Sequence, residues 1–225
     1  MKIRMWAAVV ILSALGLSAS GVVAQESGGA LPKMSTPVSN LTFVVFDTET
    51  TGLSPGKDRI VEIGAIKIQN GQIVEERDWL INPGQPIPAR ATKVHGITTE
   101  MVKDKPSFAE VYPEFQAFVG DAILMAHNAR FDVAMVKEEV ERNELAHPGN
   151  VVIDSLKLFR TWYPEAENHK LAYLAEHVGI TGDGFHRGDA DSRFTALILF
   201  EGLKSHTNCT TLRKLLAASG GVTVF

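Results

Sequence analysis

The stretch Phe43-Val-Val-Phe-Asp-Thr-Glu-Thr-Thr-Gly52 decides the fold of this chain. Its first four residues, Phe43–Phe46, are all apolar, which is typical of a central strand that is covered on both faces of a sheet. The predicted strand ends in an acidic pair, Asp47 and Glu49. Because residues i and i+2 of a strand point to the same face, both carboxylates can face one point.

Two carboxylates that share one face repel each other unless a cation lies between them. Oxygen ligands of this kind suit hard divalent ions such as Mg²⁺ and Mn²⁺. The pair Asp47 and Glu49 therefore indicates half of a metal site, although a solvated acidic pair at a strand end is the alternative. We expect the turn Thr50-Thr51-Gly52 to leave backbone N–H groups free nearby, where a phosphate could bind.

A second acidic residue, Asp132, ends the segment His127-Asn-Ala-Arg-Phe-Asp132. The apolar run Ala122–Ala126 before it predicts another buried strand, and apolar residues recur at helical spacing over Val133–Asn143. With Asn128 as the expected N-cap, Asp132 falls in the first turn, near the positive end of this helix. Stabilisation of the helix end is therefore an alternative to a role as a metal ligand.

The third group is His186-Arg-Gly-Asp-Ala-Asp191, which lies between a glycine-containing loop and a helix predicted over Asp189–Leu203. Asp191 falls on the first helical turn, and Asp189 is the more natural cap of the two acids. An imidazole, with an ordinary pKa of about 6.5, can take a proton from a water molecule. Taken alone, this segment could equally be a surface histidine beside a capping acid.

Together these three segments resemble the DEDD 3′→5′ exonucleases of the histidine subtype (DEDDh), the family of the DNA polymerase III epsilon proofreading subunit and ribonuclease T. Asp47-Thr-Glu49 is similar to the first motif of the family, His127–Asp132 to the second, and His186–Asp191 to the third. The resemblance covers residues 41–204 and shows no departure at a catalytic position. Two further segments also match the family, Ile60–Ile66 and Val94–Thr98.

The resemblance implies a metal-dependent 3′→5′ exonuclease that hydrolyses the terminal phosphodiester of single-stranded DNA or RNA ends, or of short oligonucleotides, and releases nucleoside 5′-monophosphates. It implies that two Mg²⁺ or Mn²⁺ ions are held by Asp47, Glu49, Asp132 and Asp191, with Asp47 as the bridging ligand, and that His186 is the general base. In a two-metal site, one ion activates the attacking water and the other stabilises the departing oxygen. The alternative is a catalytically weak nucleic-acid-binding or accessory module that keeps the fold.

Contacts with the terminal nucleotide are implied by the same resemblance, and Leu53 is the candidate wedge against the base. For Phe131, stacking on the sugar or base competes with a core position under the helix start. For His127, one alternative is a position that supports the metal ligands without touching the metal, and the other is a hydrogen bond within its own loop. Asp154 is expected to cap the next helix rather than to bind metal. The full expected set of substrate contacts is Thr48, Thr50, Thr51, Gly52, Leu53, His95, His127 and Phe131.

The rest of the pattern predicts an α/β fold in three layers, in which a mixed central sheet is flanked by helices. This is the ribonuclease H-like fold that the resemblance implies. Asn70-Gly71 predicts a type I′ hairpin turn. The alternating pattern that includes Ile60, Glu62, Ile66 and Ile68 predicts a sheet with one exposed face. Further strands are predicted over Ile60–Ile68, Ile73–Ile81 and Val151–Asp154, and further helices over Phe108–Val119 and Lys170–Val178.

The N-terminus has the layout of a secretory signal peptide, with a basic start, an apolar stretch over Met5–Leu17 and small residues before Ala24. Cleavage after Ala24 would export the protein to the periplasm or the medium, with no stable membrane partner. An uncleaved membrane anchor is the alternative. We expect a disordered linker over residues 25–40, the exonuclease domain over 41–204, and a tail or short helix over 205–225.

The charge of the chain bears on how nucleic acid would be held. The chain has 225 residues and a formal net charge of −4, so it does not have the strongly basic balance of a protein that binds long duplexes. Local cations such as Arg130, Arg187 and Arg193 are then expected to meet the phosphates, which favours short single-stranded 3′ ends. The single cysteine, Cys209, excludes an intramolecular disulfide. A homodimer is compatible with the family but has no clear mark in the sequence.

Overall fold

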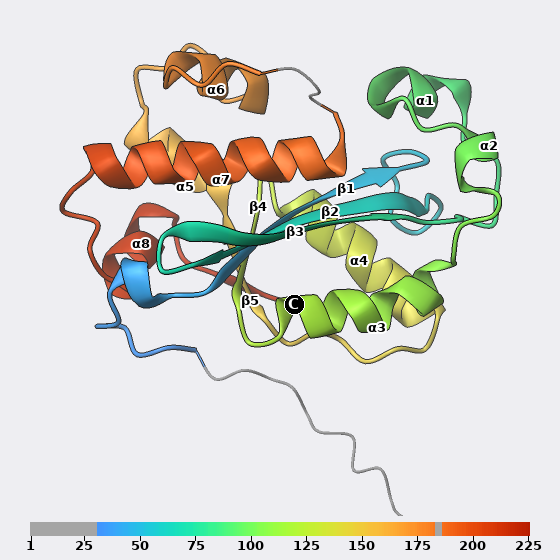
Figure 1. Cartoon of the computed structure of the whole chain (residues 1–225), viewed down its shortest axis with the longest axis horizontal. Coiled ribbons are helices and arrows are strands. Elements are labelled where there is room, and N and C mark those ends of the chain that lie inside the picture. Colours follow the sequence, from blue (N-terminus) through green and yellow to red (C-terminus); the bar gives the residue numbers. More distant parts are fainter. Residues whose placement is uncertain (1–30, 183–185) are drawn as a thin grey trace, which may run out of the picture.

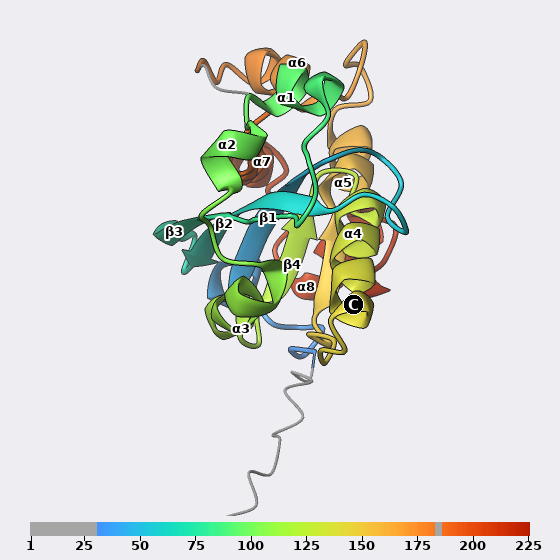
Figure 2. The same cartoon turned by 90° about the vertical axis from the view of Figure 1, so that its right-hand side faces the viewer.

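The computed structural model describes residues 31–182 and 186–225, and these are built around a mixed six-stranded sheet in the order β3-β2-β1-β4-β5-β6. The central strand β1 is antiparallel to β2 and parallel to β4. Figure 2 shows β3, β2, β1 and β4 side by side in this order. The strands are β1 (Phe43–Thr50), β2 (Ile60–Gln69), β3 (Gln72–Leu80), β4 (Ile123–Ala126), β5 (Val151–Asp154) and β6 (Thr223–Val224).

Helices cover both faces of the sheet, so the predicted three-layer α/β architecture with a mixed sheet is confirmed (Figure 1). One face carries α7 (Gly188–Ser205) together with α5 (Ser155–Trp162), α6 (Leu171–His177) and α8 (Leu212–Ala218). The opposite face carries α3 (Phe108–Val119) and α4 (Arg130–Arg142). Two short helices, α1 (Ala89–His95) and α2 (Thr99–Val102), lie beyond one end of the strands.

The side chains of β1 alternate between two hydrophobic cores. Phe43 and Val45 pack in the core under α7, and Val44 and Phe46 pack in the core under α3 and α4. All four are buried, which confirms that β1 is a central strand covered on both faces. By the same alternation, the side chains of residues 47 and 49 point toward α7 and that of residue 48 toward α4.

The strand β1 is longer than the sequence pattern predicts, because β2 pairs with it up to Thr50. Asp47 lies opposite Gly64, and Glu49 lies opposite Glu62. The acidic pair is therefore inside a strand and not at its end. This gives both carboxylates a backbone that is fixed by the neighbouring strand.

The prediction of an exposed face for β2 is wrong. Ile60–Ile66 is buried on both faces because α7 packs against the strand, and Glu62 in its middle is fully buried. The hairpin turn to β3 is as predicted, since Asn70 and Gly71 have φ values of 53° and 72°. Two positive φ values in succession are what a type I′ turn requires.

Two of the three predicted helix caps differ in the structure. Asp154 caps α5 as expected, since its Oδ1 accepts a hydrogen bond from the backbone N–H of Leu156 at 3.0 Å. The position before α4 is taken by Ala129, while Asn128 adopts a left-handed φ of 67° and makes no cap. The helix α7 begins at Gly188, so Asp189 lies inside its first turn.

Residues 31–40, expected to be part of a disordered linker, instead pack against the C-terminal segment. The carbonyl of Thr36 accepts from the N–H of Leu212, and the N–H of Val38 donates to the carbonyl of Thr210. The helix α8 is the short C-terminal helix that the prediction allowed. The predicted signal peptide lies outside the described residues, and none of the helices within 31–182 and 186–225 has the length and apolar character to cross a membrane.

The strand β2 and the helix α7 approach most closely at Gly64 and Gly188. A Cβ on Gly64 would lie 1.9 Å from the carbonyl carbon of Gly188, which is far inside van der Waals contact. Ser192 fixes the same contact, because its Oγ donates to the carbonyl of Gly64 at 2.9 Å. A Cβ on Gly188 would in turn lie 3.3 Å from the carbonyl oxygen of Asp47. Because neither glycine has a side chain, the first turn of α7 can lie against the acidic part of β1.

We expect Gly64→Ala to lower the free energy of unfolding by about 3 kcal/mol, because overpacking against backbone atoms cannot be relieved by rotating a side chain. Urea denaturation would measure the change. Gly56→Ala is the matched control, since its Cβ would lie 4.0 Å from the nearest neighbour and both changes restrict the unfolded chain equally. Equal stability of the two variants would contradict the close approach of β2 and α7.

Candidate active site

Three carboxylates meet between β1 and the first turn of α7. One oxygen atom from each of Asp47, Glu49 and Asp191 lies within 4.8 Å of the other two. The two acids of β1 face α7 because they are two residues apart in a strand, and α7 presents Asp191 because Gly188 lets it dock. The structure thus brings the acids of the first and third sequence segments to one place.

The fourth acid, Asp132, lies beside β1 in the first turn of α4 and is only 3% exposed. Its Oδ1 accepts hydrogen bonds from the backbone N–H of Thr48 at 3.0 Å and from the Thr48 hydroxyl at 2.8 Å. The ladder between β1 and β4 ends at Val45, so α4 can enter beside the later part of β1. Thr48 is buried and holds Asp132 in place, and its contact with substrate stays a prediction.

The four carboxylates are too crowded to ionise together easily. Burial, and then the charges of Asp132, Asp191 and Glu49, raise the pKa of Asp47 well above its usual range. Burial and the charge of Asp191 raise the pKa of Glu49 to about 8. Burial raises the pKa of Asp132 to about 7, against the lowering effect of the hydrogen bonds from Thr48, and that of Asp191 to about 6. Such a group of perturbed acids at one place is typical of a functional site.

His186 is exposed at the edge of this cluster and has a left-handed backbone, with φ of 68°. This conformation is uncommon for a residue with a side chain and is found mostly where the surroundings enforce it. The backbone N–H of His186 donates to Asp191 Oδ2 at 3.1 Å. The other oxygen of Asp191, Oδ1, is buried and has no hydrogen-bond partner among the residues that the structure describes. The histidine is therefore fixed at the rim of the acidic cluster through its backbone.

An ion pair that the sequence pattern did not predict lies next to His186. Glu62 accepts from Arg187 Nη2 at 2.6 Å and from Arg187 Nε at 3.0 Å. Arg187, expected to meet phosphates, is therefore committed to a buried carboxylate. Arg193 is likewise paired with Glu76. An acid inside an otherwise apolar strand was the signal that could have revealed this pair.

A cavity of about 480 Å³ opens beside Glu49 and is lined by the turn after β1 and by α1. Leu53 stands at this cavity with 83% of its surface exposed, the largest exposed fraction among the large apolar side chains of the described residues. Arg90 and Val94 line the cavity from α1. Arg90 was not among the predicted site residues, because no helix was predicted over Ala89–His95.

The turn after β1 is stabilised from within. The N–H of Thr51 donates to the carbonyl of Arg59, so the prediction that this group stays free for a phosphate is wrong. The hydroxyl of Thr51 donates to Asp58 Oδ1 at 3.1 Å, and that of Thr50 donates to the carbonyl of Gly52 at 2.6 Å. Thr50 and Thr51 therefore shape the turn, while Gly52 and the neighbouring leucine line the cavity.

The two remaining histidines of the predicted substrate set bond inside the protein. His95 accepts at Nδ1 from the N–H of Ile97 and donates from Nε2 to the carbonyl of Thr50, and burial lowers its pKa, so it is held neutral beside the cavity. His127 bonds at its two ring nitrogens to the Ser155 hydroxyl and the His169 carbonyl. Neither partner belongs to the segment 127–132, so the alternative of a hydrogen bond within the His127 loop is wrong.

Phe131 is partly buried and packs against the core under α4. This position agrees with the core alternative for Phe131 and leaves part of its ring accessible. Among the predicted substrate contacts, those that line the cavity are Thr50, Gly52, Leu53 and His95.

This chain is similar in sequence to known proteins over most of its length. The chain matches the RNase T family, described as an exonuclease, over residues 44–199. A DNA polymerase III subunit epsilon-like protein from Rhodobacter capsulatus is 48% identical over 160 residues, which cover 68% of this chain and 22% of that protein. The PolC-type DNA polymerase III of Halalkalibacterium halodurans is 37% identical over 171 residues, which cover 76% of this chain and 12% of that protein. The chain thus spans only a small part of the length of these curated relatives.

Solved structures of exonucleases are similar to this chain in fold. The structure of exonuclease X in complex with 5′-overhanging duplex DNA matches with a TM-score of 0.64 and 28% identity, covering 79% of this chain and 99% of that one. Escherichia coli exonuclease I, solved with an oligonucleotide, shares the fold with a TM-score of 0.68 and 21% identity, covering 75% of this chain and 42% of that one. The sheet and its helices are therefore the predicted ribonuclease H-like fold, and the chain belongs to the RNase T family of exonucleases.

Proposed function

We propose that this domain is a 3′→5′ exonuclease that uses two divalent metal ions, acts on single-stranded DNA or RNA ends and releases nucleoside 5′-monophosphates. The observation that carries the proposal is the meeting of Asp47, Glu49 and Asp191 at one point, with Asp132 alongside. Membership of an exonuclease family supports it, as does the similarity to exonuclease X, which was solved with DNA. The complete acidic set favours turnover over an accessory binding module.

The donor set fits Mg²⁺ or Mn²⁺, because it consists of carboxylates, the hard oxygen ligands that these ions prefer. The raised pKa values mean that the protein itself does not compensate the four negative charges, and Asp191 Oδ1 is buried without a partner. Asp47 would be the ligand shared by the two ions, since burial and then the charges of the other three acids raise its pKa. Ions bound there would lower the pKa of a water molecule and stabilise negative charge on the leaving oxygen.

The residues of the chain supply the remaining tasks. His186, exposed beside Asp191, is the proposed general base that takes the proton of the attacking water onto a ring nitrogen. The cavity beside Glu49 is the proposed place of the terminal nucleotide, with Leu53 against the base. Arg90 offers a positive charge on the cavity wall, which helps a chain of net charge −4 to hold a short end of nucleic acid.

We further propose that the protein works outside the cytoplasm, where it would trim or degrade nucleic acid. The support is the signal-peptide layout of residues 1–24. A role in replication beside a DNA polymerase would instead require the cytoplasm.

Without divalent metal, the melting temperature should fall as the pH rises from 4.5 to about 8. Over this range folded Glu49, with its pKa raised from 4.5 to about 8, keeps a proton that the unfolded chain has lost. Its stabilising contribution is therefore complete below pH 4.5 and lost as the pH passes about 8. The raised pKa values of Asp132 and Asp191 act in the same direction. Stabilisation by Mg²⁺ should grow over the same range, and thermal unfolding in EDTA and in Mg²⁺ would measure both trends.

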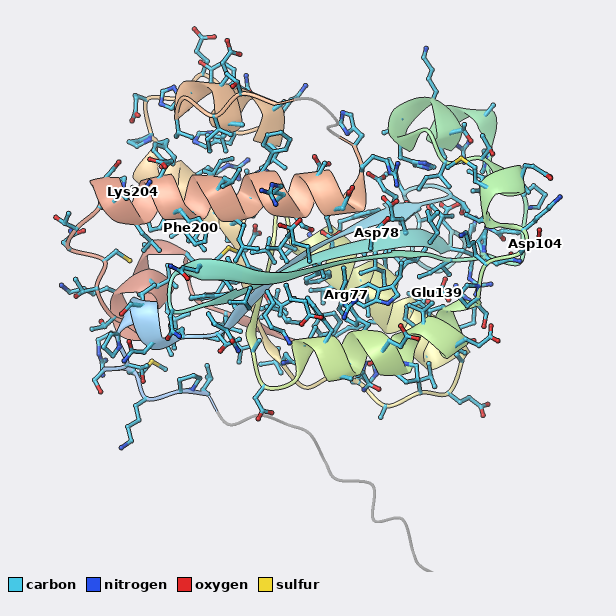
Figure 3. The ribbon with its side chains drawn as sticks, viewed as in Figure 1. Arg77, Asp78, Asp104, Glu139, Phe200 and Lys204 are labelled. Atoms are coloured by element: carbon cyan, nitrogen blue, oxygen red, sulfur yellow. The ribbon has the colours of Figure 1, made fainter. Side chains whose placement is uncertain are left out.

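The variant Asp47→Asn separates the two effects, because it removes one of the crowded charges. It should melt higher than the wild type in EDTA at pH 8, yet lose most of the stabilisation by Mg²⁺. Asp104→Asn, which changes an exposed acid in the turn after α2 (Figure 3), should alter neither value. A full response to Mg²⁺ in Asp47→Asn would contradict the metal assignment.

With 5′-labelled single-stranded DNA and RNA, we expect a ladder that shortens from the 3′ end only when Mg²⁺ or Mn²⁺ is present. Asp47→Asn should lower kcat about a hundred-fold or more, because ligand loss removes several kcal/mol of charge stabilisation, and Asp104→Asn should act like the wild type. Chromatography should identify nucleoside 5′-monophosphates. Early release of a short 5′-labelled product would contradict the direction, and nucleic-acid binding without cleavage would favour the accessory module.

Leu53→Ala should raise KM about ten-fold and leave kcat almost unchanged, because it removes apolar surface that the terminal base would cover. Val74→Ala is the matched control, since Val74 is also an exposed apolar residue, 51% accessible, but lies on β3. Initial rates over a range of oligonucleotide concentrations give both constants. A KM equal to that of the wild type in Leu53→Ala would contradict this placement of the terminal nucleotide.

A further inference from the structure

Glu62 is a fully buried carboxylate in the middle of an apolar strand. A buried charge is costly unless it is paired and hydrogen-bonded. Here the compensation comes from two consecutive residues, because Glu62 accepts from both Nε and Nη2 of Arg187 and, at 2.7 Å, from the backbone N–H of Gly188. These are the two residues that directly follow His186.

We infer that Glu62 is a positioning residue for catalysis, which holds His186 and the start of α7 in place through Arg187 and Gly188. The inference rests on the proposed function, in which His186 is the general base and Asp191 a ligand. It concerns a side chain on β2 that touches none of the reacting groups directly.

The backbone of His186 shows why such a hold is needed. Its φ of 68° is an uncommon, unfavourable backbone conformation for a residue with a side chain. On one side the N–H of His186 is fixed by Asp191 Oδ2, and on the other side Arg187 and Gly188 are fixed by Glu62. Without Glu62, the strained residue would be held from one side only and could relax away from the cluster.

The pair also compensates a repulsion across the sheet. Glu62 lies opposite Glu49, and like charges in such a cross-strand pair are destabilising. The charge of Glu62 raises the pKa of Glu49, and the charge of Arg187 lowers it. Arg187 therefore allows an acid to occupy this position of β2 beside the cluster.

Asp78, on β3 (Figure 3), offers a matched control close to the same arginine. Its Oδ2 lies 3.8 Å from Arg187 Nη2, beyond hydrogen-bond distance, and it does not contact Gly188 in any hydrogen bond of the described chain. Asp78→Asn therefore changes a side chain that faces Arg187 and Glu62, but it leaves the hydrogen bonds from Arg187 and Gly188 to Glu62 in place.

The test compares Glu62→Gln, Arg187→Lys and Asp78→Asn in exonuclease assays and in NMR spectra of the histidine ring protons, with the His186 signal assigned from His186→Ala. Glu62→Gln keeps the size of the side chain but loses the charge that holds the arginine and the N–H of Gly188. We expect kcat to fall ten- to a hundred-fold, as for residues that orient catalytic groups, with KM within about two-fold. The His186 signal should shift or broaden, and the signals of the other six histidines should stay unchanged.

Arg187→Lys keeps the charge but not the two-pronged contact, so it should show the same signature more weakly. The double variant Glu62→Gln/Arg187→Lys should lose no more activity than Glu62→Gln alone, because both act through one contact. Asp78→Asn should resemble the wild type in kcat and in the His186 signal. If Glu62→Gln does not fold, Arg187→Lys tests the inference instead, because the Arg187 side chain is partly exposed and its replacement is less disruptive.

Three results would overturn the inference: wild-type kcat in folded Glu62→Gln, an unchanged His186 signal in that variant, or multiplicative losses in the double variant. The failure of the proposed function would look different. In that case the wild type itself would not degrade nucleic acid, while the comparison of His186 signals would still show whether Glu62 holds the residue in place.

Discussion

The contact between Gly64 of β2 and Gly188 of α7 is the constraint on which the site depends. A side chain at either position would push α7 away from the sheet. Because the helix docks at this point, Asp191 on its first turn reaches Asp47 of β1. The acidic cluster is therefore a product of packing between two elements that are more than a hundred residues apart in the sequence.

The cluster itself is electrostatically unfavourable and lies where the packing can support it. Burial and mutual repulsion raise the pKa values of the four carboxylates, and Asp191 has a buried oxygen without a partner. Strain at His186 adds to this cost. The acidic cluster thus lowers the stability of this end of the sheet. A bound divalent cation would offset the repulsion between the carboxylates.

Local pattern predicted the parts of the fold and site that depend on neighbours in the sequence. The two-residue spacing of Asp47 and Glu49, the burial of the strand before them and the turn at Asn70-Gly71 were all accessible in this way. Long-range partners were not. The burial of Glu62 depends on an arginine 125 residues later, and the N–H of Thr51 is taken by the carbonyl of Arg59 across a loop. A local pattern carries no information on such partners, so it wrongly predicts an exposed face for β2 and a free N–H at Thr51.

In the proposed metal site, four carboxylates from β1, α4 and α7 together hold two divalent ions. Titration of the purified protein with Mn²⁺ in a calorimeter, in the presence of a nucleoside 5′-monophosphate, tests it most directly. We expect two bound Mn²⁺ ions per chain in the wild type, and the loss of at least one of them in Asp132→Asn. Absence of Mn²⁺ binding, or two ions bound as tightly in Asp132→Asn as in the wild type, would contradict it.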